Sequence, residues 1–65
     1  MKRYYYELLD AQYDNLGACI PDGGHKSTAV NLAKKWMREN GVQLAYLQVN
    51  SMRTDNLLEI IEITL

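Results

Sequence analysis

The sequence has almost none of the cysteine and histidine residues from which a disulfide or a zinc site forms. The chain of 65 residues contains one cysteine and one histidine, so neither an internal disulfide nor a Cys/His zinc cluster can stabilise it. A chain of this length buries only about 60% of the surface that its unfolded state exposes, so its core contributes little stability. Of the devices that stabilise small proteins, association between copies is the one that this composition leaves open.

A strong charge of one sign and a long apolar run are also missing. The net charge is −1, from seven basic and eight acidic residues, which argues against strong attraction to nucleic acid or a membrane surface. No apolar run approaches the roughly 20 residues of a membrane span, and no signal-peptide pattern follows Met1. The lone cysteine is typical of a reducing compartment. We therefore expect a cytoplasmic protein without membrane attachment.

Glycine and proline are few, and their positions mark out one helix. Pro21 and the glycines at 23 and 24 end one segment, and Asn40-Gly41 ends the next. Between these breaks, apolar residues recur at helical spacing: Ala29, Val30, Ala33, Trp36 and Met37. The pattern predicts one helix over about residues 25–40, with Gly41 in a left-handed conformation after its last turn.

In the other hydrophobic segments, apolar residues alternate along the chain or β-branched residues predominate. Both patterns favour strands. The predicted strands cover residues 2–9, 16–20, 42–51 and 57–65. For 57–65, a helix capped by Thr54 or Asp55 remains an alternative. The order β-β-α-β-β predicts a single α+β domain over residues 1–65. Its four-stranded, mostly antiparallel sheet has the helix packed on one face, and the strand order is left open.

One helix covers only one face of such a sheet, and the other face is also partly apolar. A sheet with one face in water would alternate cleanly between apolar and polar residues. Exposed apolar patches of this kind usually mark interaction surfaces. We therefore predict a non-enzymatic interaction module that self-associates through this face or a sheet edge, most simply as a homodimer; another protein partner stays open. The residues of the predicted surface are Tyr5, Leu44, Tyr46, Leu58 and Ile60.

Nucleic-acid binding is the alternative function. Lys34, Lys35 and Arg38 form a modest basic patch on the predicted helix, and the tyrosines at 4–6 offer rings on which bases could stack. Basic residues combined with aromatic rings suit single-stranded nucleic acid. The negative net charge favours the protein-interaction hypothesis over this one.

The residues that could support catalysis lack partners in the sequence. Residues 23–28 lie between a strand and a helix, as phosphate loops do, but His25 stands where that pattern requires a glycine. Neither His25 nor Cys19 has a predicted partner for acid–base or nucleophilic chemistry. Glu59 and Glu62 point to opposite faces of a strand. We expect no enzyme activity, no cofactor and no metal.

Overall fold

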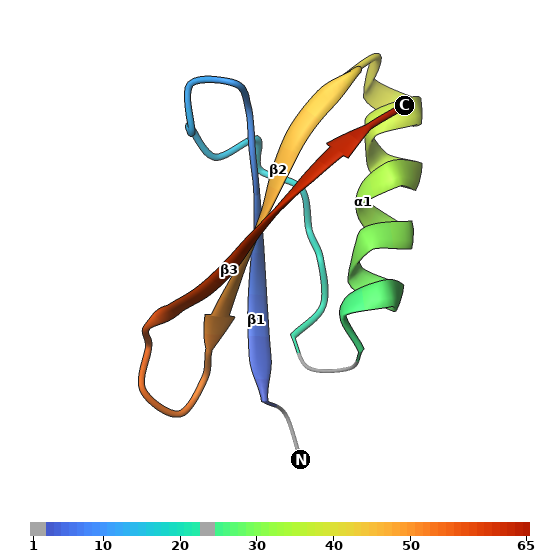
Figure 1. The fold of residues 1–65 in the computed structure, drawn as a ribbon. Helices are drawn as coiled ribbons and strands as arrows, with labels where there is room; N and C mark the ends of the chain where they lie inside the picture. The colour runs from blue at the N-terminus through green and yellow to red at the C-terminus, as the bar shows by residue number, and fades with distance from the viewer. Residues whose placement is uncertain (1–2, 23–24) are drawn as a thin grey trace.

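The protein is one helix on a three-stranded antiparallel sheet, seen in a computed structural model that describes residues 3–22 and 25–65. The elements follow in the order β1 (Tyr4–Leu9), α1 (Lys26–Asn40), β2 (Leu44–Ser51) and β3 (Leu57–Thr64). The sheet order is β1-β2-β3, so β2 is the central strand. Figure 1 shows α1 lying along one face of the strongly twisted sheet.

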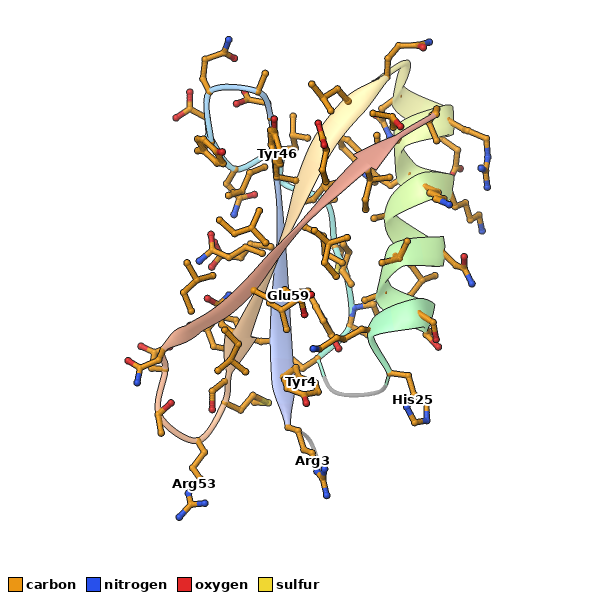
Figure 2. The ribbon with its side chains drawn as sticks, viewed as in Figure 1. Arg3, Tyr4, His25, Tyr46, Arg53 and Glu59 are labelled. Atoms are coloured by element: carbon orange, nitrogen blue, oxygen red, sulfur yellow. The ribbon has the colours of Figure 1, made fainter. Side chains whose placement is uncertain are left out.

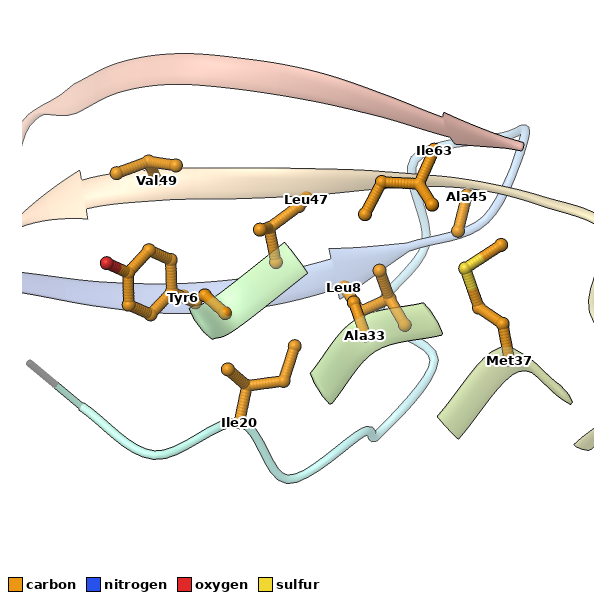
Figure 3. Close-up of a cluster of buried hydrophobic side chains, with 10 residues drawn as sticks. Tyr6, Leu8, Ile20, Ala33, Met37, Ala45, Leu47, Val49 and Ile63 are labelled. Atoms are coloured by element: carbon orange, nitrogen blue, oxygen red, sulfur yellow. The ribbon is translucent and has the colours of Figure 1, made fainter. Parts of the chain in front are cut away.

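The predicted number of strands is wrong, because residues 16–20 form no strand. Among the described residues, the chain that follows β1 pairs with it in a single isolated bridge, between Leu9 and Asn15. The Asn15 side chain accepts a hydrogen bond from the N–H of Gly17 at 2.6 Å, and Gly17 has a positive φ of 76°. This local turn takes the chain out of the extended ladder. The segment then runs beside β1, on the side away from β2, and Ile20 enters the core (Figure 3).

The helix agrees with its predicted limits. Gly41 has φ 69°, and its N–H donates to the C=O of Met37, as does the N–H of Val42 at 2.9 Å. These bonds end the helix in the way that a glycine in the left-handed conformation allows. Ala29, Ala33 and Met37 are the buried residues of α1, so the apolar stripe faces the sheet.

The two strands after the helix form a hairpin. Residues of β3 pair with β2 from Leu44 opposite Thr64 to Asn50 opposite Leu57, so the helical alternative for this segment is excluded. The register shifts at Asn50, which makes Leu58 the extra residue of a β-bulge.

The hydrophobic core lies between the sheet and α1. Figure 3 shows side chains from all three strands, the helix and the segment before it meeting in one cluster. Its buried members are Tyr6, Leu8, Ile20, Ala29, Ala33, Met37, Ala45, Leu47, Val49 and Ile63. On β3 only Ile63 is buried, so the core is centred on β1 and β2 and leaves most of β3 outside.

Candidate interaction surface

We call the sheet face opposite α1 the open face. Successive side chains of a strand point to opposite faces, so the neighbours of the core residues Leu8 and Leu47 point away from α1. The pairing register carries this alternation across the sheet. The open face therefore holds Tyr5, Glu7 and Leu9 of β1, Leu44, Tyr46, Gln48 and Asn50 of β2, and Leu57, Ile60, Glu62 and Thr64 of β3.

The structure brings the five predicted surface residues to this side of the sheet but exposes them unequally. Tyr5, Leu44, Tyr46 and Ile60 lie on the open face, and Leu58 sits at its edge in the bulge. Leu58 and Ile60 are exposed, whereas the other three are partly buried. The most accessible part of the predicted surface is therefore on β3.

The loop that follows β1 covers part of the open face. The ring of Tyr13 stacks on Tyr46, with centroids 5.0 Å apart and planes at 30°. Leu9, the neighbour of Tyr46 across β1 and β2, is buried. Tyr13 has φ 63°, a conformation that is unusual for a bulky residue. Figure 2 shows Tyr46 at the end of the sheet where this loop lies.

The sequence held a signal for this loop, although it did not reveal what the loop covers. Asp10 accepts hydrogen bonds at its Oδ1 from the backbone N–H groups of Gln12, at 2.8 Å, and Asp14, at 3.0 Å. An aspartate that bonds the backbone just ahead of it is a common turn-forming device. That device predicts a turn, whereas the contact of Tyr13 with β2 depends on the assembled sheet.

The opposite end of the open face is polar and tied to the β2–β3 turn. The Tyr5 hydroxyl donates a hydrogen bond to Asp55, and this bond raises the pKa of Tyr5 above 10.0. Beside Tyr5 in the register lies Asn50, which is buried and accepts a hydrogen bond at Oδ1 from Nε2 of Gln48 at 2.9 Å. Among the described residues, the Nδ2 of Asn50 finds no hydrogen-bond partner. These groups limit how far an apolar partner can extend across the face.

An exposed apolar strip remains along β3. Leu57, Leu58 and Ile60 are 52%, 53% and 42% exposed, and we call these three residues the β3 strip. β3 is an edge strand and is the strand nearest the viewer in Figure 1. A row of large aliphatic side chains on an uncovered edge strand is a typical site of pairing with another chain.

The predicted basic patch is on the helix, away from a usable aromatic surface. Lys35 and Arg38 are exposed and Lys34 is partly buried. The N-terminal tyrosines do not form one stacking surface with them, because Tyr6 is in the core and Tyr5 lies on the open face. Nucleic-acid binding stays a prediction, and a mobility-shift assay at low salt tests it.

One ion pair links the start of α1 to β3 and was not predicted from the sequence. Nζ of Lys26 lies 2.7 Å from Oε1 of Glu59 and 5.6 Å from the ring centroid of Tyr4. Figure 2 shows Glu59 and Tyr4 on the same side of the sheet. The hydrogen bond to Glu59 raises the pKa of Lys26 above its ordinary 10.5. Glu59 therefore faces α1 while Glu62 faces away.

The remaining candidates for chemistry stay apart. Cys19 is exposed and forms no disulfide, and His25 is the exposed residue just before the first turn of α1. In the described ranges, 3–22 and 25–65, no group of three or more His, Cys, Asp and Glu side chains could hold a metal ion. Glycines 23 and 24, part of the phosphate-loop comparison, lie outside these ranges.

Comparison with known proteins adds no further constraint. No protein-family model, curated protein or solved structure matches the chain. In the described part of the chain, no helix is both long and apolar enough to cross a membrane.

Proposed function

We propose that the protein is a small interaction module that associates with a second copy of itself through the β3 strip. The observation that carries this proposal is the exposure of Leu57, Leu58 and Ile60 on an edge strand. Single exposed leucines are ordinary on protein surfaces. Adjacent large aliphatic residues on an edge strand are not, because such an edge recruits other chains.

In the part of the chain that the structure describes, α1 and the loop of residues 10–15 cover the sheet, and both leave the β3 strip free. The helix packs on the opposite face, against residues such as Leu8 and Leu47. The loop of residues 10–15 reaches the open face at Tyr46, at the other end of the β2–β3 hairpin from Leu57. Glu59 and Glu62 interrupt the aliphatic sequence of β3, which is how natural edge strands restrain uncontrolled aggregation.

A second copy is the occupant that the size of the chain favours. A small core supplies little stability, and association of identical copies supplements it without a disulfide or a metal. The accessible surface is 4420 Å², and a stable interface takes about 800 Å² from each partner. Three side chains are too few for that area, so the interface also includes neighbouring parts of the β3 edge and open face.

The test is the oligomeric state of the wild-type chain and two matched variants. Sedimentation velocity from about 1 to 500 μM, a range that brackets modest interfaces, is expected to show a monomer–dimer equilibrium. Leu58→Glu is expected to shift the protein to monomer, because it places a charge in the strip. Leu32→Glu, which changes another exposed leucine on α1, is the control and is expected to leave the equilibrium unchanged.

Two results would contradict the proposal. A wild-type chain that remains monomeric over the whole concentration range has no self-association to explain. A dimer that survives Leu58→Glu but is lost in Leu32→Glu assembles through the helix instead. Circular dichroism of both variants checks that the loss of the dimer is not a loss of the fold.

A further inference from the structure

We infer that two copies join by antiparallel pairing of their β3 strands, about a two-fold axis that passes through Ile60 and is perpendicular to the sheet. The inference rests on the proposed self-association and specifies its geometry. In this arrangement the two sheets become one continuous sheet, and both helices lie on the same side of it. The supporting observations are the backbone orientation of β3, the state of the other edge and the distribution of charge.

The backbone of β3 offers hydrogen-bonding groups on its outer side. The N–H of Leu65 donates to the C=O of Gln43 at 3.0 Å, one position beyond the β2–β3 register. In an antiparallel pair, residues that bond to the neighbouring strand alternate with residues whose N–H and C=O point away from it. Counting back from Leu65 as far as the bulge, this alternation turns the backbone groups of Thr64, Glu62 and Ile60 outward. Within the described residues, β3 has no strand on that side.

The other edge of the sheet is less available. The C=O of Leu8 in β1 accepts a hydrogen bond from the N–H of Leu16 at 2.9 Å, and Leu9 pairs with Asn15 in a bridge. The chain itself thus occupies the end of the β1 edge that adjoins the loop. A second copy would have to displace these residues to pair there, whereas pairing at β3 displaces nothing that the structure describes.

Charge narrows the possible registers of a β3–β3 pair. With the two-fold axis at Ile60, Ile60 faces its counterpart and Leu58 faces Glu62 of the second copy. With the axis at Glu59 or at Glu62, two identical glutamates would face each other. Like charges directly opposite on paired strands are destabilising, so these two registers are disfavoured.

Among registers centred on residues 59–62, the one centred on Ile61 is the remaining competitor, and the ion pair of Glu59 separates it from the one centred on Ile60. An axis at Ile61 brings the two Glu62 side chains into diagonal positions, about 7–8 Å apart. An axis at Ile60 brings the two Glu59 side chains into diagonal positions instead. Each Glu59 is already paired with Lys26 of its own chain at 2.7 Å, so the repulsion between them is reduced. The Ile60 register therefore has the better charge arrangement.

Cysteine cross-linking tests the register. In a background with Cys19→Ser, Ile60→Cys places two thiols on residues about 5.5 Å apart at Cα, within the range that a disulfide spans. Under mild oxidation we expect it to cross-link roughly tenfold faster, or more, than Leu32→Cys, because pairing raises the effective thiol concentration. Faster cross-linking of Ile61→Cys than of Ile60→Cys would overturn the proposed register.

A proline substitution tests the backbone pairing itself. Glu62→Pro removes an N–H that points outward and that β2 does not use, so the monomer is expected to keep its fold. The same change removes a hydrogen bond from each half of the dimer, so we expect roughly tenfold weaker association or worse. Glu62→Ala is the matched control, because it removes the side chain and keeps the N–H.

Amide hydrogen exchange separates a failure of this geometry from a failure of self-association. Edge pairing is expected to slow exchange at Ile60 and Glu62 as the protein concentration rises. If sedimentation shows a dimer but these amides stay fast and Glu62→Pro has no effect, the copies pack by their open faces. The proposed function then stands and the inference fails. If sedimentation shows only a monomer, both fail.

Discussion

β1 and β3 flank the same central strand, yet the less aliphatic of the two is the better buried. β1 reads YYYELL and has three buried residues, Tyr6, Leu8 and Leu9. β3 reads LLEIIEIT and has one, Ile63. Both strands pair with β2 in antiparallel register along most of their length. Strand pairing and residue hydrophobicity therefore do not explain the difference in burial.

The difference comes from what lies over each strand. On the helix side, β1 contributes Tyr6 and Leu8 to the cluster that α1 and Ile20 close. On the open side, the loop of residues 10–15 covers the end that carries Leu9. β3 lies beyond both covers, and its aliphatic side chains remain exposed. The proposed self-association rests on these uncovered aliphatic residues at the edge of the sheet.

The largest expected effect is the loss of a leucine from β1. Leu8 is fully buried, so Leu8→Ala removes a large side chain from the core and is expected to cost about 2–5 kcal/mol of unfolding free energy. A domain of this size has about 3–10 kcal/mol in total, so the variant is expected to be close to unfolded. Urea denaturation followed by tryptophan fluorescence measures the change.

The matched change on β3 is expected to separate folding from association. Leu58→Ala alters a side chain that is mostly exposed in the monomer and is expected to change the monomer's unfolding free energy by less than about 1 kcal/mol. It is expected to weaken the dimer, measured by sedimentation. If Leu58→Ala destabilises the monomer as much as Leu8→Ala does, the contrast between β1 and β3 is wrong.

An intermediate effect is expected from loosening the loop that covers β1. Asp10→Ala removes the acceptor for the N–H groups of Gln12 and Asp14, and is expected to cost about 1–2 kcal/mol. The amide of Leu16, bonded to Leu8, should then exchange faster. Asp10→Asn keeps an oxygen at that position and is expected to lose less. Equal losses in the two variants would show that the carboxylate charge matters more than the acceptor.

Alkaline pH is expected to weaken the native state through Tyr5 of β1 and through Lys26, which is bonded to Glu59 of β3. The hydrogen bond to Asp55 raises the pKa of Tyr5, and the hydrogen bond to Glu59 raises the pKa of Lys26. A raised pKa means that the folded chain holds its proton at a pH where the unfolded chain has lost it. The stability from these two contacts is therefore present below pH 10 and falls as the pH rises further. Urea denaturation from about pH 8 to 11 should show this fall, and Tyr5→Phe should reduce it.

The smallest expected effect is the loss of the ion pair that joins β3 to α1. Lys26 and Glu59 are both substantially exposed, so Glu59→Gln is expected to lower the thermal midpoint only slightly. At about 1 M salt, which screens exposed charges, the difference from wild type should disappear. A difference that persists at high salt would mean that the contact acts by packing rather than by charge.

Local patterns predicted the helix well because its signals are local. The stripe that includes Ala29, Ala33 and Met37 has helical spacing, and Asn40-Gly41 is a stop signal that needs no distant partner. The same reasoning failed for residues 16–20. Their alternation resembles a strand, but a strand forms only when a neighbour pairs with it. The turn at Gly17 takes the chain out of the ladder, and Ile20 enters the core instead.

For the candidate surface, too, the local pattern predicted some features, whereas others depend on contacts between distant segments. The alternation of β2 and β3 was enough to predict that Tyr46 and Ile60 lie on the face away from the helix. It could not show that Tyr13 covers Tyr46 while Ile60 stays exposed, because that contact depends on how the loop folds back over the sheet.

The amino-acid pattern alone determined the class of the fold, the limits of the helix and the excess of apolar residues over what one helix can cover. These properties follow from spacing and composition, which a chain carries before it folds. Tertiary packing decided which strand leaves its excess apolar side chains exposed to solvent. α1, Ile20 and Tyr13 close around β1 and β2, and the edge position of β3 leaves Leu57, Leu58 and Ile60 in contact with solvent. Burial depends on contacts between distant segments, and only the assembled chain has those contacts.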